Sequence, residues 1–202
     1  MRTFYTSDLH IGHRLAAEER GFASPADHDA ELAKRWDAVV KPGDRVCVLG
    51  DISLGGKANT LRALEWIDDR PGTKELIAGN HDECHPMRSR AVHWKNLFEV
   101  SAFASVQHAA THKIAGQRVM LSHFPFYDDP DGDHTPENRF PEWRVPDVGQ
   151  WLLHGHTHSS VAVRGRQLHV GVDAHNLTPV PQRWVAEQIQ PPIVDLWALE
   201  RC

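Results

Sequence analysis

Carboxylate and imidazole side chains recur where strand-like segments of this sequence end. Asp8 and His10 follow the apolar stretch TFYT, and His156 and His158 follow WLLH. In an extended segment, residues two positions apart face the same side, so we expect each pair to reach a single metal ion. Three further segments each end in one candidate ligand: Asp51, Asn80 and His123.

These side chains are hard and borderline metal ligands. Carboxylate, imidazole and amide donors suit Mn²⁺, iron, Zn²⁺ or Co²⁺ better than copper or Ca²⁺. The donors are too many for one tetrahedral ion, and they suit two ions that share a carboxylate. We therefore expect two divalent cations as the cofactor, with Mn²⁺ as the first choice.

The first half of the chain has the pattern of a parallel sheet. Strand-like stretches at 3–8, 44–51 and 74–82 alternate with helical patterns at 27–40 and 59–69, and Asp27 is a candidate cap for the first helix. Such a βαβαβ order predicts parallel strands with crossover helices. Because ligands gather at the carboxyl ends of strands in α/β sheets, the candidate ligands are expected to converge.

The second half is richer in strands. Residues 103–123 read as a hairpin around Ala115-Gly116, and shorter strands are expected at 150–158, 160–165 and 167–174, in an antiparallel or mixed sheet. Between them lies a long loop at 126–147, rich in proline and acidic residues. Loops of this length inside a compact domain are often functional.

Length and composition limit the class of protein. The chain has 202 residues, which fits a single domain over 1–202, and a formal net charge of −5, which argues against a long nucleic-acid track but not against one phosphate. No apolar run is long enough to span a membrane, and no signal-peptide pattern opens the sequence. Three scattered cysteines fit free thiols in a reducing cytoplasm, where we expect the protein. Nothing in the composition indicates an oligomeric state.

Five short motifs occur in a fixed order: SDLH, LGD, GNHD, SH and GHTH, between residues 7 and 158. In this order they resemble the calcineurin-like metallophosphoesterases, and VGVDAHNLTPV after them resembles the end of small bacterial and phage members. Any one motif is a weak signal, but the ordered set is specific. The resemblance implies an α/β fold, a calcineurin-like β-sandwich of two mixed sheets flanked by helices.

The resemblance also implies a role for each ligand. One metal would be held by Asp8, His10 and His158. The other would be held by Asn80, His123 and His156, with Asp51 as the bridge between the two. Taken singly, such residues are more often turn residues, caps or core histidines, and only their joint pattern favours a metal centre.

The implied chemistry is hydrolysis of a phosphoester. Two bound ions would supply an activated water and positive charge for the phosphoryl oxygens, while the resemblance implies that His81 is the proton donor for the leaving group and that Asp82 orients His81. Two aspartates and a hydroxide against two divalent ions leave a site charge of about +1, which favours a compact phosphate ester. Candidate substrate contacts are His13, Arg14, Phe140 and Trp143.

The substrate expected from the resemblance is a small phosphodiester. GDISLGG lacks the arginine that follows Gly-Asp in the protein phosphatases of this superfamily, and the chain has no room for the capping domain of the repair nucleases. What remains is a phosphodiesterase for small substrates such as cyclic nucleotides, with 2′,3′-cyclic phosphates as one guess. The alternatives are a phosphomonoesterase, a nucleotide pyrophosphatase, or a non-catalytic scaffold with the same fold.

Two stretches allow more than one interpretation. His-Ile-Gly-His at 10–13 matches a signature of nucleotide-adenylating enzymes, but the lysine-rich loop that accompanies it there is missing. In NRFPEWR, Phe140 and Trp143 lie between two arginines, as in a lid that stacks on a base while arginine meets phosphate. Equally, these aromatic side chains could anchor the loop to the core.

Overall fold

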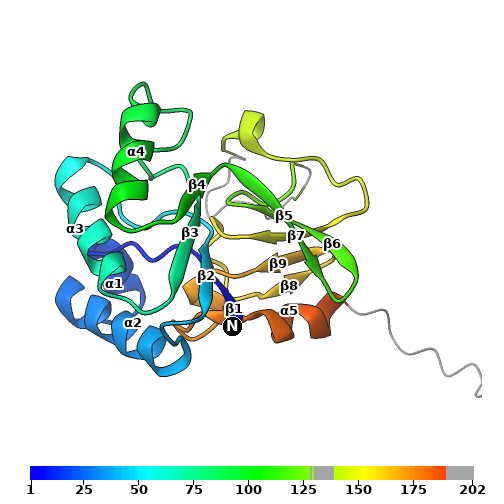
Figure 1. Cartoon of the computed structure of the whole chain (residues 1–202), viewed down its shortest axis with the longest axis horizontal. Coiled ribbons are helices and arrows are strands. Elements are labelled where there is room, and N and C mark those ends of the chain that lie inside the picture. Colours follow the sequence, from blue (N-terminus) through cyan, green and yellow to red (C-terminus); the bar gives the residue numbers. More distant parts are fainter. Residues whose placement is uncertain (128, 130–138, 190–202) are drawn as a thin grey trace, which may run out of the picture.

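The computed structural model describes residues 1–127, 129 and 139–189, which form two facing five-stranded sheets with helices outside them (Figure 1). The first sheet has the order β10-β1-β2-β3-β4. Its central strands are parallel, and β10 is antiparallel to β1. Its strands are β1 (Thr3–Thr6), β2 (Arg45–Val48), β3 (Thr73–Ile77), β4 (Ser105–Gln107) and β10 (Val180–Pro181).

The second sheet has the order β5-β6-β7-β9-β8 and is also mixed. β6, β7 and β9 run parallel, while β5 and β8 are antiparallel edge strands. Its strands are β5 (Ala109–Ile114), β6 (Gln117–Ser122), β7 (Trp151–His154), β8 (Val163–Arg164) and β9 (Gln167–His169).

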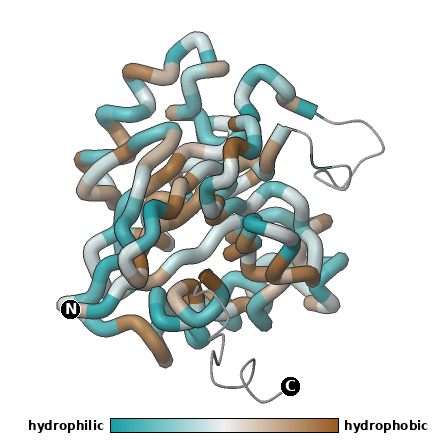
Figure 2. Tube along the Cα trace, turned by 90° about the vertical axis from the view of Figure 1, so that its right-hand side faces the viewer, coloured by the Kyte–Doolittle hydropathy of each residue, from teal (hydrophilic) through white to brown (hydrophobic). Residues whose placement is uncertain are grey.

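Side chains along the strands of the first sheet point alternately to its two faces, so the protein has two hydrophobic cores. Phe4 and Val46 face the helices and pack with Trp36, while Tyr5 and Cys47 face the second sheet. Figure 1 shows α1 to α4 on the outer side of the first sheet and α5 below the two sheets. Figure 2 shows brown, hence hydrophobic, segments of the chain in the middle of the molecule. The helices are α1 (Arg14–Glu19), α2 (Pro25–Val39), α3 (Lys57–Asp68), α4 (Ala91–Ser101) and α5 (Gln182–Ile189).

The predicted fold class is confirmed: βαβαβ leads into a parallel sheet, and a second mixed sheet faces it. The hairpin turn is also confirmed, since Ala115 and Gly116 have φ of 46° and 81°, the left-handed values that a two-residue turn of type I′ requires. None of the helices in the described ranges is long and apolar enough to cross a membrane.

Some of the helix and strand boundaries predicted from the sequence were wrong. Ser24 caps α2, and Asp27 lies inside the first turn, where its backbone N–H donates to Ser24 Oγ. The stretch 103–123 is more than a hairpin, because β4 at its start joins the first sheet beside β3. α1, α4 and α5 were not predicted. In α4 only Trp94 and Phe98 are buried, and the exposed Val92 and Val100 obscure the helical periodicity.

Candidate metal centre

The candidate ligands meet where strands of both sheets end. They follow β1, β2 and β3 of the first sheet and β6 and β7 of the second. Several of them line one cavity of about 280 Å³, together with the side chains of Leu15, Leu54 and His81. The ligand candidates in its wall are His10, Asp51, Asn80, His156 and His158.

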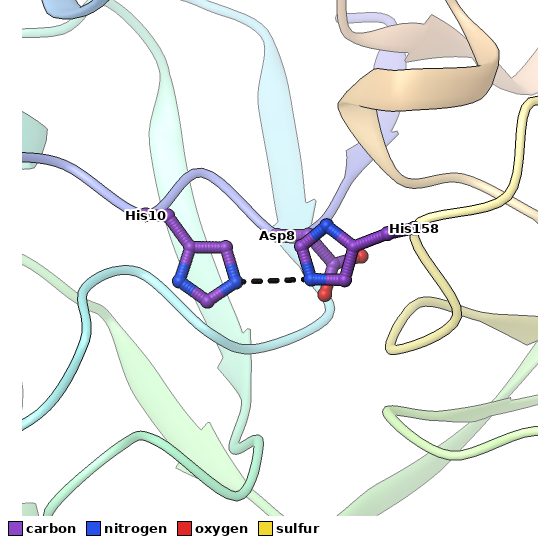
Figure 3. Close-up of side chains that lie close together, drawn as sticks. All are labelled: Asp8, His10 and His158. Atoms are coloured by element: carbon purple, nitrogen blue, oxygen red, sulfur yellow. Dashed lines mark hydrogen bonds between the residues drawn. The ribbon is translucent and has the colours of Figure 1, made fainter. Parts of the chain in front are cut away.

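Asp8, His10 and His158 form one group. Each offers a ligand atom, and these atoms lie within 4.8 Å of one another. The two imidazole rings face each other with 3.2 Å between their Nε2 atoms, beside the Asp8 carboxylate (Figure 3). Two imidazole nitrogens this close to a buried carboxylate form a suitable site for a divalent cation.

Asp51, His123 and His156 form a second group, again with ligand atoms within 4.8 Å of one another. Asn80 extends it, because its Oδ1 lies 3.1 Å from His123 Nε2. Asp51 Oδ2 lies 3.4 Å from His123 Nε2 and 4.0 Å from His10 Nε2, which belongs to the first group. The Asp51 carboxylate thus lies between the two groups, as a bridging ligand must.

The electrostatics of the centre favour bound cations. Burial favours neutral carboxyl groups, but the neighbouring histidines hold the pKa values of Asp8 and Asp51 well below the usual range. Burial also lowers the pKa of His10 to about 3. At His123 burial is outweighed by the Asp51 carboxylate, which raises the pKa to about 9. The carboxylates are therefore ionised beside a positively charged His123, and the donor set fits divalent cations that would take the place of its Nε2 proton.

Several candidate ligands lie in an unusual backbone conformation. The sequence-based expectation that extended strands carry the paired residues was wrong, because β1 and β7 end before them. Left-handed φ values turn these side chains inward instead. They occur at Asp8 (59°), His10 (49°), Asp51 (56°), His156 (70°) and His158 (51°). Such a backbone costs a residue with a Cβ roughly 1–2 kcal/mol, so strain is concentrated at the centre.

Glycine permits the close approach of the loops after β2 and β3. Gly50 has φ of +89°, and a Cβ there would lie 2.6 Å from both the Gly79 nitrogen and His123 Nδ1. With that space free, His123 Nδ1 lies 2.7 Å from the Leu49 carbonyl oxygen. This contact fits an Nδ1–H donor, which leaves Nε2 free for a metal.

An aspartate that the sequence reasoning missed supports the first group. Asp173 Oδ2 lies 3.1 Å from His158 Nδ1, and Arg20 donates to both oxygens of Asp173 at 2.8 Å. A carboxylate behind a metal-binding imidazole fixes the ring and its tautomer. Asp173 lies in VGVDA, which is part of the stretch that resembles the end of small bacterial and phage members, but that resemblance implied no role for it.

We expect Asp173→Asn to weaken binding at the first group about 10–100-fold, because His158 loses the carboxylate that orients it. Equilibrium metal titration of the metal-free protein should show the weaker site. Asp68→Asn on the exposed surface of α3 is the matched control and should titrate like the wild type. Unchanged affinity in Asp173→Asn would mean that packing alone orients His158.

His81 occupies the position expected of a proton donor. Its Nδ1 lies 3.0 Å from the Leu54 carbonyl oxygen, and its Nε2 lies 4.0 Å from Asp51 Oδ2 in the cavity wall. The side chain is 31% exposed, so a substrate can reach it. The Leu54 contact leaves Nε2 as the nitrogen that faces the cavity.

The expectation that Asp82 orients His81 was wrong. The buried Asp82 carboxylate instead accepts backbone N–H bonds from Gly79, Asp51 and Ile52 at 2.8–3.1 Å. Burial, followed by the charge of Asp51, raises the pKa of Asp82 to about 7. Asp82 therefore ties together the turns that carry Asp51 and Asn80, while Leu54 orients His81.

The predicted substrate contacts fall into different places. His13 lines the cavity. Arg14 points away from it, with a side chain 84% exposed and its Nε 2.7 Å from Glu18. Phe140 packs 5.5 Å from Phe124 and 6.0 Å from His156, measured between ring centres. Trp143 packs edge-on against the buried His85 at 4.7 Å. The remainder of the expected loop, 128 and 130–138, lies outside the described residues.

The profile of the calcineurin-like phosphoesterase family matches residues 1–160. The chain belongs to this family. Its members are metal-dependent phosphoester hydrolases, and the two groups of aspartate and histidine are the corresponding candidate metal sites. The adenylating interpretation of His-Ile-Gly-His is thus unsupported, since His10 lies in a candidate ligand group.

Two phage proteins are similar to this chain along most of their length. Identity is 46% over 189 residues with the Gene 66 protein of Mycobacterium phage D29, covering 89% of this chain and 92% of that protein. It is 46% over 183 residues with the Gene 66 protein of Mycobacterium phage L5, covering 85% and 86%. The structure of protein AQ665 from Aquifex aeolicus shares the fold, with a TM-score of 0.68 and 20% identity over 93% of this chain and 99% of that one.

Proposed function

We propose that the protein is a phosphodiesterase with a dinuclear metal centre, acting on small phosphodiesters such as cyclic nucleotides, including 2′,3′-cyclic phosphates. The observation that carries the proposal is the position of Asp51 Oδ2, 3.4 Å from a nitrogen of one ligand group and 4.0 Å from a nitrogen of the other. A shared carboxylate is what a pair of metal ions requires.

The ligand assignment follows from the two groups. Asp8, His10 and His158 would hold one ion, and Asn80, His123 and His156 the other. We propose Mn²⁺ as the preferred ion, with iron, Zn²⁺ or Co²⁺ as substitutes. When bound, such a pair supplies an activated water and positive charge for the phosphoryl oxygens.

Residues of the chain supply the remaining chemistry. His81 Nε2 faces the cavity and would give its proton to the leaving oxygen, while the Leu54 carbonyl keeps the ring in place. Asp82 acts at a distance from the substrate by holding two ligand turns together.

The cavity supports a small substrate. Its volume of about 280 Å³ is at the lower end of the usual range for ligand pockets. Leu15 and Leu54 in its wall are 55% and 44% exposed, and they offer apolar contact to the organic part of an ester. The net charge of −5 disfavours a long polyanion.

A substrate panel tests the proposal. The purified protein, loaded with Mn²⁺, is assayed on bis-nitrophenyl phosphate, nitrophenyl phosphate, 2′,3′-cyclic nucleotides and nucleoside diphosphates. We expect the diesters and cyclic phosphates to be hydrolysed with a higher kcat/KM than the monoester. Faster turnover of the monoester or of the diphosphates would replace the proposal with the corresponding activity. Bound metal without hydrolysis of any substrate would support a non-catalytic scaffold.

The contact of Trp143 with His85 favours an anchoring role for this residue over a lid. We expect Trp143→Ala to destabilise the protein by about 1–2 kcal/mol, less than the 3–5 kcal/mol typical of a fully buried tryptophan. Thermal unfolding should show the loss, and the kcat/KM values for a nucleotide and for a nitrophenyl diester should fall by the same factor.

Trp184→Ala is a matched control for this substitution, because Trp184 packs on His175 at 4.8 Å and 81°, against 4.7 Å and 80° for the Trp143–His85 pair. It should lower the melting temperature without a change in kinetics. A rise in KM confined to the nucleotide in Trp143→Ala would show that Trp143 contacts the substrate instead.

A further inference from the structure

A second cluster of metal-binding side chains lies between the two sheets. Cys47 on β2 and Glu75 on β3 are direct partners in the parallel register, and Tyr5 on β1 is the partner of Cys47 on the other side. His112 comes from β5 of the facing sheet, with its Nδ1 2.9 Å from the Tyr5 hydroxyl. The cluster shares no residue with the dinuclear centre.

The spacing of the donors suits one tetrahedral ion. Cys47, Glu75 and His112 each offer a ligand atom, and these atoms lie within 4.8 Å of one another. Cys47 Sγ lies 3.6 Å from Glu75 Oε2. Zn²⁺ binds thiolate at about 2.3 Å and carboxylate at about 2.0–2.2 Å, so tetrahedral angles place the two donors about 3.5 Å apart. The two donors from the first sheet already stand at that distance.

The surroundings hold the donors in place. Arg45 Nε lies 3.4 Å from Glu75 Oε1, which leaves Oε2 directed at Cys47. The Tyr5 hydroxyl fixes the His112 ring, as an outer partner does for a metal-bound imidazole. Cys47 is buried, but Glu75 and His112 are partly exposed, so an ion can enter from their side.

The donor set of the cluster indicates which cation it would take. In the metal-free cluster the Cys47 thiol donates its proton to Glu75 Oε2. A cation must displace this proton, and Zn²⁺ and Co²⁺ bind thiolate well enough to do so, whereas Mn²⁺ and Mg²⁺ prefer oxygen donors.

We propose that Cys47, Glu75 and His112 form a separate zinc-type site that links the two sheets, with water as the fourth ligand. Binding forms Zn–S, Zn–O and Zn–N bonds and releases the thiol proton to solvent. The site would join β2 and β3 to β5 and would lie away from the cavity that holds His81.

Cobalt spectroscopy tests the site directly. The donors of the dinuclear centre contain no sulfur, so a thiolate-to-cobalt charge-transfer band in the near ultraviolet can come only from a cysteine. We expect the wild-type protein, saturated with Co²⁺, to show this band and to lose it when Zn²⁺ is added. Cys47→Ser should abolish the band and lower the bound metal by about one equivalent per chain.

Controls separate this site from the others. Cys84→Ser and Cys202→Ser should keep the band, and His112→Gln should weaken it. Zn²⁺ should raise the melting temperature of the wild type more than that of Cys47→Ser, while Cys47→Ser keeps its phosphodiesterase activity. A wild-type protein without the band, or a band that survives in Cys47→Ser, would overturn the site. Both of these outcomes are read from the spectrum and not from hydrolysis. A failure of the zinc-type site can therefore be told apart from a failure of the proposed phosphodiesterase function.

Discussion

Asp51→Asn is expected to reduce phosphodiester hydrolysis by more than about 100-fold. This exceeds the loss of about 10–100-fold that is typical when a residue hydrogen-bonded to a metal ligand is replaced. Asparagine has the shape of aspartate, but it lacks the charge that two cations would share. Asp51 Oδ2 lies between His123 and His10, one from each ligand group. Both sites should therefore weaken together.

Metal analysis and steady-state kinetics on the same preparation measure this effect. Asp68→Asn makes the same chemical change on the exposed surface of α3 and should leave activity and metal content unchanged. Asp51 Oδ1 also accepts the His81 backbone N–H at 2.9 Å, and asparagine has only one oxygen for this bond and for the bridging position, so thermal unfolding of the metal-free protein must accompany the assay. Full activity with two metals bound would rule out Asp51 as the bridge.

The second large effect is expected for His81→Ala. A general acid typically contributes 10²–10⁴-fold, so turnover of a diester with a poor leaving group should fall by about that factor. The loss should be much smaller for a nitrophenyl diester, because nitrophenolate leaves with little need of a proton. Metal content should stay the same, since His81 belongs to neither ligand group.

Leaving-group dependence distinguishes acid catalysis from a structural role. A series of aryl diesters of rising leaving-group pKa should give a steeper decline of kcat in His81→Ala than in the wild type. His93→Ala, an exposed histidine on α4, is the control and should follow the wild-type line. Parallel lines for His81→Ala and the wild type would assign His81 to binding or positioning.

The sequence predicted the ligand candidates because they lie in short motifs whose order is specific. The structure gathers these residues at the ends of β1, β2, β3, β6 and β7, and the two predicted groups both form. The parallel first sheet was also predictable, since its strands and helices alternate with clear periodicity.

Other features depended on tertiary contacts that no spacing reveals. Asp82 follows His81 directly in the sequence, yet its carboxylate turns to the backbone of Gly79, Asp51 and Ile52. Asp173 reaches His158 from a short 3-10 helix, Val172–Ala174, that follows the bridge between Ser7 and Gly171. α4 escaped prediction because its few buried residues give a weak periodic signal.

The left-handed backbone at the ligand residues couples folding to the concentration of free metal. Without cations, the chain must keep these conformations, and mainly the neighbouring histidines offset the charge of the ionised aspartates, so the metal-free protein should be the less stable form. An ion that binds only the folded state adds about 2.7 kcal/mol when its concentration is 100 times the Kd.

Calorimetry in buffers of fixed free Mn²⁺ measures this coupling. The melting temperature should rise steadily with the logarithm of free metal and fall to a constant lower value in a chelator. By mass action, the thermal stability of this protein thus depends on the free metal concentration as well as on the sequence. A melting temperature should therefore be given together with the free metal concentration at which it was measured.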